Sequence, residues 1–233
     1  MSLGLLFVWI ISVSVLCSFA SLYVRRFGRP DALIALYVIL VTFANLAAGK
    51  IIGFDLGFAT YFAPATVVVF SVTFLLTDIV NERFGREETQ RMIYIAIACQ
   101  VAVIALSQLV LRAQGAPFFE NQGAFEVIFG SVPRVVLASL LAFTISESAD
   151  AYLFQWFRQL TKGKKLWMRN IFSSLPSMAI DSIIFTSIAF AGIIPLMPII
   201  IGNIVIKWLV GVVDVPFMYL SRAVLGKSEN LTR

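Results

Sequence analysis

The hydropathy pattern of the chain is a series of long apolar runs separated by short charged connections. Seven runs are each close to the roughly 20 residues that the hydrocarbon core of a bilayer requires. They are Leu3 to Val24, Ala32 to Ile52, Tyr61 to Val80, Met92 to Leu111, Arg134 to Phe157, Ile171 to Gly192 and Pro198 to Ser221. The runs are continuous and do not alternate with a period of two, which favours helices over a closed barrel. We therefore predict an all-α polytopic membrane protein with seven transmembrane helices.

Positive charges in the connections predict the orientation of these helices. Fourteen of the eighteen Lys and Arg residues follow the first, third and fifth runs or lie in the C-terminal tail. The opposite side carries only Arg112 and Arg134, while Lys50 and Lys207 fall within the runs. Because cytoplasmic loops carry an excess of basic residues, we expect the N-terminus outside and the C-terminus in the cytoplasm.

Composition supports the membrane class and a single domain. Hydrophobic residues make up 60% of the chain and charged residues only 13%, with a mean hydropathy of +0.92. The net charge of +5 is spread between apolar runs, so we expect no nucleic-acid partner. No connection is long enough to bury its own core, and we expect one domain over residues 1–233. The first run lacks a basic leader and is long enough to span, so it reads as a retained helix.

Several kinds of chemistry have no support in the sequence. There is no histidine, which removes Ser-His-Asp hydrolysis and histidine metal sites. Cys17 and Cys99 lie in apolar runs, where they behave as small hydrophobic residues. No metal-ligand spacing, nucleophile elbow or cofactor fingerprint occurs. We expect a protein that is not an enzyme and that binds no metal or cofactor.

The third run ends in a stretch, from Ser71 to Arg86, that brings a carboxylate toward the hydrocarbon. Asp78 is followed by Glu82 one helical turn later, so the two side chains share a face. A carboxylate at such a depth is costly and is a functional-site candidate by default. The alternative is that this stretch is only the solvated end of a helix.

The last three runs carry further polar side chains that hydrocarbon should exclude. Glu147 and Asp150 lie three residues apart, and such a pair in a low dielectric needs a proton or a cation. Asp181 lies on the sixth run, and Lys207 on the seventh run could neutralise an acid of the fifth or sixth. Gln100 on the fourth run could instead be simple interhelical glue.

These residues form an intramembrane set in which acids outnumber bases. The expected substrate-binding residues are Asn45, Asp78, Glu147, Asp150, Asp181 and Lys207. Secondary candidates are Phe74, Ser177, Phe185 and Asn203. Aromatic rings beside hydrogen-bonding groups suit a small polar or planar solute, and protonation of a carboxylate is one possible coupling.

Several motifs together resemble the queuosine-precursor transporter family, also called the vitamin uptake transporter family. They are ANLAAGK in the second run, TDIVNERFG at Thr77 to Gly85, ASLLAFTISESADAYLFQWFR at Ala138 to Arg158, KKLWMRNIFSSLPSMAIDSIIFTSIAF at Lys164 to Phe190, then Lys207 and Pro216. The similarity covers six of the seven runs, so residues 1–30 look like an extra N-terminal helix and first cytoplasmic loop. Glu147 and Met178 depart from the family pattern, which often has an amide such as glutamine there.

The resemblance implies import of 7-cyano- or 7-aminomethyl-7-deazaguanine, or a related purine-like base, across the cytoplasmic (inner) membrane for transfer RNA modification. Two alternatives stay open: a substrate-binding membrane subunit that depends on a separate ATPase module, or a transporter of another vitamin-like solute. A homodimer is compatible with either. Residues 112–133 form either a lid-like interfacial segment or a plain loop with aromatic residues.

Overall fold

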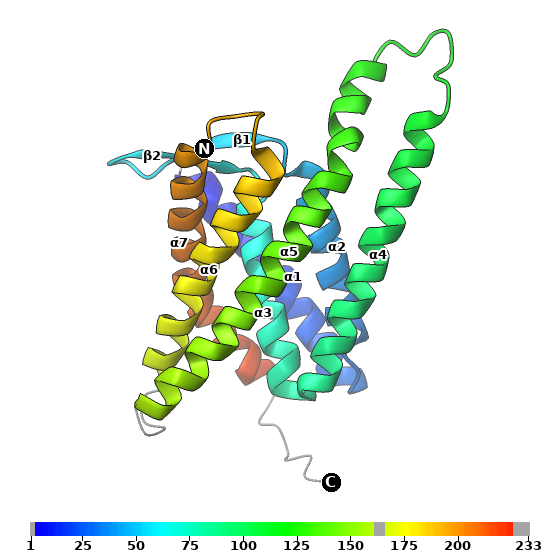
Figure 1. Ribbon diagram of the computed structural model, residues 1–233. Helices are drawn as coiled ribbons and strands as arrows, with labels where there is room; N and C mark the ends of the chain where they lie inside the picture. The colour runs from blue at the N-terminus through cyan, green and yellow to red at the C-terminus, as the bar shows by residue number, and fades with distance from the viewer. Residues whose placement is uncertain (1–2, 161–165, 226–233) are drawn as a thin grey trace.

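The computed structural model describes residues 3–160 and 166–225, which form a bundle of long helices with one small hairpin (Figure 1). In chain order the elements are α1 (Leu3–Phe27), α2 (Asp31–Ala47), β1 (Ile51–Asp55), β2 (Thr60–Pro64), α3 (Val67–Phe84), α4 (Arg86–Arg112), α5 (Gln122–Leu160), α6 (Leu166–Phe190) and α7 (Leu196–Leu225). Each predicted run contributes a helix, so the mostly helical class is confirmed. Within the described part of the chain, three helices, α1, α4 and α5, are long and apolar enough to cross a membrane, and α2, α3, α6 and α7 contain shorter apolar stretches.

The first departure from the predicted pattern is a two-stranded antiparallel hairpin between α2 and α3. β1 pairs with β2 from Ile51 opposite Pro64 to Asp55 opposite Thr60. The prediction that the second run stays helical to Ile52 and that the third begins at Tyr61 is therefore wrong. Lys50, which was expected within the membrane, lies exposed at the entry to β1.

The local sequence of the hairpin explains why the helices stop. Gly57 adopts a φ of 87°, which is open to glycine but strained for other residues. Its N–H donates to Asp55 Oδ1 at 2.9 Å, an Asx-type turn that competes with helix. Pro64 lacks an N–H and is the last residue of β2. The hydropathy pattern on its own does not reveal these turn signals.

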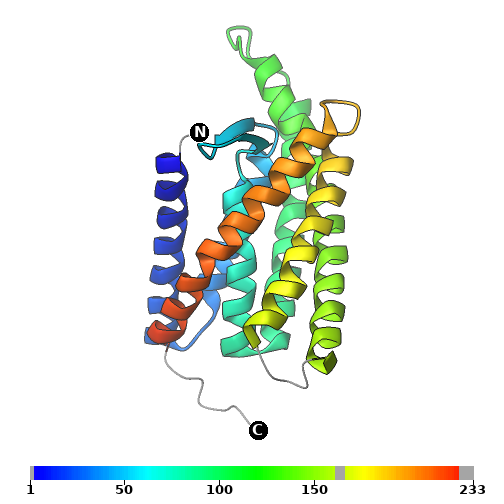
Figure 2. The same cartoon turned by 90° about the vertical axis from the view of Figure 1, so that its left-hand side faces the viewer.

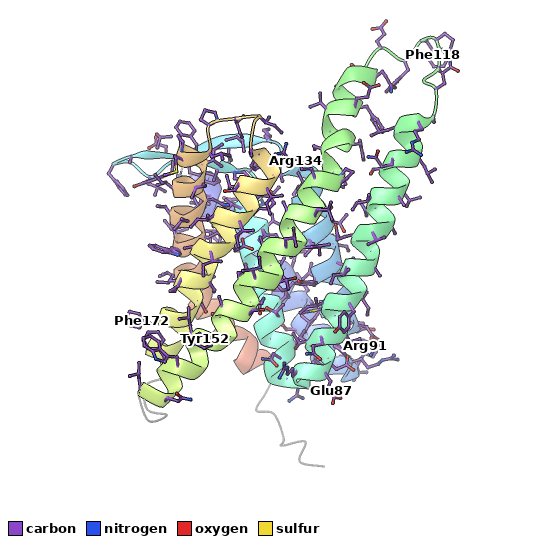
Figure 3. All side chains as sticks on the ribbon, viewed as in Figure 1. Glu87, Arg91, Phe118, Arg134, Tyr152 and Phe172 are labelled. Atoms are coloured by element: carbon purple, nitrogen blue, oxygen red, sulfur yellow. The ribbon has the colours of Figure 1, made fainter. Side chains whose placement is uncertain are left out.

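The second departure lies in the long connection between the fourth and fifth runs. Helix α5 begins at Gln122, so much of the segment 112–133 is helical and only its first part is a loop. Pro133 is accommodated inside α5. The Phe125 and Phe129 rings stack at 4.4 Å between centroids, while Phe118 at the tip is 86% exposed. This end of α5 rises with α4 beyond the hairpin (Figures 1 and 3).

The helices run up and down the bundle, so their connections fall at two ends. The N-terminal end of α1, the hairpin, the α4–α5 loop and the α6–α7 loop share one end, and the C-terminal end of α7 lies at the other (Figure 2). Glu87 and Arg91 lie at that second end, far from Phe118 (Figure 3). This arrangement matches the alternation of connections that the charge pattern predicted.

Apolar packing ties the hairpin and α1 into the bundle. One buried cluster joins α1, the hairpin, α3 and α7 through side chains that include Leu6, Phe54, Val68 and Ile206. A second cluster joins the four helices α1, α2, α3 and α4, and it includes Leu33, Leu76 and Met92. Because these clusters remove the core-facing side chains from lipid and water, they hold fixed the helix faces that carry the polar residues.

Candidate functional site

A small cavity beneath the hairpin collects polar side chains from several helices. It is lined by Ala44, Asn45, Ala48, Pro64, Thr66, Val67, Phe70, Asp181, Phe185, Asn203 and Lys207. Four predicted residues from α2, α6 and α7 therefore meet here, and they are Asn45, Asp181, Asn203 and Lys207. Phe185, a secondary candidate, lines the same space. Sequence positions more than 130 residues apart form one site.

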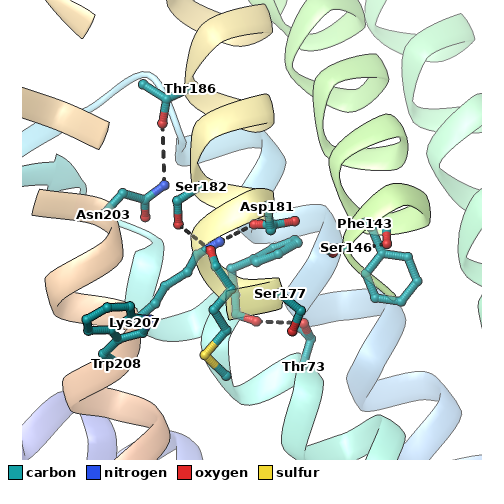
Figure 4. Close-up of polar contacts among 12 residues, drawn as sticks. Thr73, Phe143, Ser146, Ser177, Asp181, Ser182, Thr186, Asn203, Lys207 and Trp208 are labelled. Atoms are coloured by element: carbon teal, nitrogen blue, oxygen red, sulfur yellow. Dashed lines mark hydrogen bonds and ion pairs between the residues drawn. The ribbon is translucent and has the colours of Figure 1, made fainter. Parts of the chain in front are cut away.

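The central feature of the cavity is a buried ion pair between α6 and α7. Lys207 Nζ donates to Asp181 Oδ2, and the two side chains are only 3% and 1% exposed (Figure 4). The ammonium also lies 5.0 Å from the centre of the Phe70 ring, a cation–π contact. The expected neutralisation of an acid by Lys207 is thus confirmed, and its partner is Asp181.

One oxygen of this pair has unused hydrogen-bonding capacity. Among the described residues, Asp181 Oδ1 is a buried side-chain atom without a hydrogen-bond partner. Leaving a buried acceptor unsatisfied costs about 1–3 kcal/mol, and more for a charged group. An acceptor kept in this state on a cavity wall is suited to a ligand N–H.

Two side-chain amides in the cavity wall, those of Asn203 and Asn45, are held by hydrogen bonds. Asn203 Nδ2 donates to Thr186 Oγ1 at 3.5 Å, which links α7 to α6 (Figure 4). Asn45 Nδ2 donates to Gln100 Oε1 at 3.1 Å on α4. Thr66 Oγ1 donates to the Ala44 carbonyl at 3.2 Å and anchors the end of the hairpin on α2. These bonds fix the shape of the wall.

A second polar group lies one turn along α6 from the ion pair and does not line the cavity. Ser177 Oγ is within hydrogen-bond distance of Asp150 Oδ1, at 3.2 Å, and of the Ser174 carbonyl, at 2.9 Å. Ser177 and Asp181 are four residues apart, so they share the inner face of α6. The polar groups of the bundle therefore form two levels, with Asp181 and Lys207 nearer the hairpin and Asp150 with Ser177 nearer the opposite end.

Of the remaining predicted residues, Glu147 and Phe74 are not among the described side chains that line the cavity. Glu147 is half-buried on α5 and interacts electrostatically with the buried Tyr37 of α2. Phe74 packs edge-on against Phe70, with 5.9 Å between ring centres. The backbone of Asp78 belongs to α3, but its side chain is not among those the structure describes.

Sequence reasoning missed several wall residues. Thr66 and Phe70 are ordinary in an apolar run, and Pro64 was not identified as a site residue. Gln100 was interpreted as interhelical glue, yet it bonds to a cavity residue. The one available signal was spacing, because Phe70, Phe74 and the polar end of α3 recur at helical intervals.

The cavity is small in this conformation. Its volume is about 20 Å³, enough for about one water molecule. Sites for drug-sized ligands usually occupy about 300–1,000 Å³. The polar residues are thus gathered and preoriented, and a larger ligand requires the walls to separate.

Comparisons with known proteins agree with this architecture. A family model described as "Putative vitamin uptake transporter" matches residues 64–221. A protein of Bacillus subtilis (strain 168), named "Probable queuosine precursor transporter", is 32% identical over 166 residues, which are 70% of this chain and 72% of that protein. A protein of the same name from Haemophilus influenzae (strain ATCC 51907 / DSM 11121 / KW20 / Rd) is 26% identical over 123 residues, covering 53% and 50% of the two chains. No solved structure matches the chain. From the extent of the family match and of the first relative, the chain belongs to the vitamin uptake transporter family, whose members are multi-pass membrane transporters.

Proposed function

We propose that this protein imports a queuosine precursor, a 7-deazaguanine base such as the 7-cyano or 7-aminomethyl compound, across the cytoplasmic membrane. The observation that carries the proposal is the buried Asp181–Lys207 pair. Asp181 Oδ1 lacks a partner among the described residues, and both residues line a cavity together with two phenylalanines. The names of the two relatives indicate the class of substrate. A guanine-type base presents N–H donors, a carbonyl acceptor and a flat ring, and the cavity offers a complement to each.

The binding mode follows from the polarity of each wall. Asp181 Oδ1 accepts an N–H of the base, a charge-assisted hydrogen bond that is stronger than a neutral one. Lys207 has three donors, and one that is not directed at Asp181 reaches the carbonyl oxygen. Phe70 and Phe185 cover the two faces of the base and so favour a planar ligand.

Entry requires a movement, and the hairpin is the element placed to make it. Pro64 and Thr66, at and just after its second strand, line the cavity, and the strands lie over it at the outer end of the bundle. We infer that the hairpin separates from α7 to admit the base from outside. Asp150 and Ser177 then mark the next polar level on the way to the cytoplasm. Such alternation of access around a fixed midplane site is the general behaviour of secondary transporters.

The membrane topology belongs to the same proposal. Seven helices span the bilayer with the N-terminus outside, and residues 1–30 form a helix and loop that precede the family core as one domain. We expect transport rather than catalysis, without a resident metal or cofactor, and a homodimer is compatible with the exposed outer faces of the helices.

Uptake of labelled base by cells that lack their own route tests the proposal. Cells expressing the chain should accumulate radiolabelled 7-cyano-7-deazaguanine above an empty-vector control, and unlabelled base should compete. Absence of uptake for every 7-deazaguanine, with the protein present in the membrane, would overturn the substrate assignment.

Reconstitution separates independent transport from dependence on an ATPase. The purified chain in liposomes should carry the base without a second protein. Transport that appears only when an ATPase module is added would instead support the substrate-binding subunit.

A further inference from the structure

Gln100 is a buried polar side chain that the proposed mechanism leaves without a role. It lies on α4 with 0% of its surface exposed, and it does not line the cavity. Its Nε2 donates to Thr42 Oγ1 at 2.8 Å, and its Oε1 accepts from Asn45 Nδ2 at 3.1 Å. Both ends of the Gln100 amide are therefore bonded to α2. The bond to Thr42 limits rotation of the Gln100 amide, and the bond from Asn45 limits rotation of the Asn45 amide.

The hydrogen bonds of Gln100 affect the orientation of Asn45, which does line the cavity. Because Asn45 Nδ2 is engaged by Gln100, the amide oxygen is the group of Asn45 that remains for a ligand. Of the side chains described in the structure, none donates to Asn45 Oδ1. Without Gln100, the amide could rotate by 180° and present its NH₂ group at little cost, because the nitrogen and oxygen ends have nearly the same shape.

Two acceptors therefore belong to one cavity, Asn45 Oδ1 from α2 and Asp181 Oδ1 from α6. A ligand that satisfies both must bring at least two N–H donors. A guanine-type edge does so with its ring N–H and exocyclic amino group, whereas the same base without the amino group brings one donor to that edge. A ligand that leaves one buried acceptor unpaired binds less tightly, so the cavity should strongly favour a base that brings the second donor.

We infer that Gln100 is a positioning residue for substrate specificity. By orienting the Asn45 amide, it makes the cavity prefer a purine-like base with an exocyclic amino group over the base that lacks it. This inference rests on the proposed function, since it assumes that the cavity binds such a base. It adds a residue from α4, a helix that does not line the cavity, to the determinants of recognition.

The test is a binding titration of the purified full-length protein with 7-cyano-7-deazaguanine and with its analogue lacking the 2-amino group. The wild-type protein should favour the amino-containing base by roughly tenfold or more, the equivalent of one hydrogen bond. Gln100→Leu should reduce this preference to about twofold or less. Gln100→Glu should retain most of it, because a protonated carboxyl group can donate to Thr42 and accept from Asn45 as the amide does.

A matched control distinguishes positioning from a general effect on the helix. Gln108→Leu removes the same side chain from the same helix, two turns away and half-buried. It should leave the ratio of the two affinities unchanged, even if both affinities fall together.

The outcomes separate this inference from the proposed function. If the wild-type protein binds neither base, the proposed function fails. If it prefers the amino-containing base and Gln100→Leu keeps the full ratio, or if the wild type prefers the analogue, the role of Gln100 is overturned while base transport stands. Should Gln100→Leu fail to fold, Thr42→Val decides, because it removes only one bond of Gln100. An unchanged ratio in that variant would contradict the inference.

Discussion

The Asp181–Lys207 pair poses an energetic question at the scale of single residues. Two charges that are 1% and 3% exposed lose their hydration, and the attraction between them often fails to repay that loss. Apolar side chains of similar volume would commonly make the bundle as stable or more so. The pair is therefore better explained by ligand recognition than by stability.

A double-mutant comparison tests this explanation. Asp181→Asn leaves the Lys207 ammonium buried without its counter-charge, and we expect a loss of about 3–5 kcal/mol in unfolding free energy. Adding Lys207→Met should restore most of the stability, because no charge then remains buried. Both variants should lose uptake of the base. Thermal unfolding in detergent and cellular uptake measure the two effects.

Ser182→Ala is the matched control for this comparison. Ser182 is fully buried beside Asp181, and among the described residues its hydroxyl bonds only to the Met178 carbonyl of its own helix. Uptake should persist in this variant. Normal uptake by the Asp181→Asn, Lys207→Met double variant would show that the pair does not contact the substrate.

At this scale the sequence predicted which residue types matter but not how they combine. Asp181 and Lys207 were identifiable because charges are rare in hydrocarbon. Their pairing with each other, and the exclusion of Glu147 and Asp150 from the cavity lining, depend on how α5, α6 and α7 rotate against one another. Phe70 and Gln100 gave no signal of their own, since an aromatic or amide residue in an apolar run is equally compatible with ordinary packing.

At the scale of elements, the backbone of the hairpin lies in close contact with α7. A Cβ atom on Gly202 would come within 2.0 Å of the Phe62 carbonyl oxygen, so the backbone of β2 lies directly on this helical glycine. Gly202 lies beside Asn203, which lines the cavity. The close approach thus holds the hairpin down over the polar residues.

Gly202→Ala should therefore displace the hairpin. We expect faster amide hydrogen exchange over residues 51–64 and altered uptake, although alanine itself favours helix by about 1 kcal/mol. Gly211→Ala is the control on the same helix, because its Cβ would meet only the flexible end of Met178, at 3.4 Å. Unchanged exchange of the hairpin in Gly202→Ala would contradict the close packing.

The end of α6 is held by a cap from a neighbouring helix. Arg134 of α5 donates from Nε to the Ile188 carbonyl and from Nη2 to the Ala191 carbonyl, both at 2.7 Å. A cation at a helix C-terminus also interacts favourably with the helix dipole.

We expect Arg134→Ala to lower the unfolding free energy by about 1–3 kcal/mol, because two carbonyls lose a charged donor. Arg134→Lys, which keeps the charge but not the fork of donors, should lose less. Arg112→Ala, at the exposed end of α4, should have little effect. Thermal unfolding of the purified variants measures all three, and equal stability of Arg134→Ala and wild type would contradict the cap.

Among the elements, the helices were predictable and the hairpin was not. Long apolar runs report burial in lipid or protein, and each of them yielded a helix. The outer ends of the two strands, at residues 51–52 and 61–64, are apolar and were assigned to the neighbouring runs, while the turn at Asp55 to Gly57 lay in the connection between them. The start of α5 at Gln122 was missed for the opposite reason, since its first turns are too polar and aromatic to resemble a span.

For the molecule as a whole, the two ends of the bundle should face opposite sides of the membrane. In a variant with both native cysteines replaced, a cysteine at position 118 should react with an impermeant reagent added to intact cells. A cysteine at position 87 should react only after the cells are opened. Phe118 and Glu87 suit this experiment because both are exposed and lie at opposite ends of the bundle (Figure 3). Labelling in the reverse pattern would invert the proposed orientation.

The hairpin has one more consequence for the transport cycle. Its strands pair with each other, and its two ends are joined by a bond from the Ala65 N–H to the Lys50 carbonyl at 2.7 Å. A hairpin attached in this way can move as a rigid unit about its base. The hydrogen bonds between its two strands then stay formed during the motion. Opening therefore sacrifices apolar contacts around Phe54 and the fit at Gly202 but breaks no ladder bonds. A gate of this kind can move at the edge of a bilayer, where an unravelled strand would expose unpaired amides to lipid.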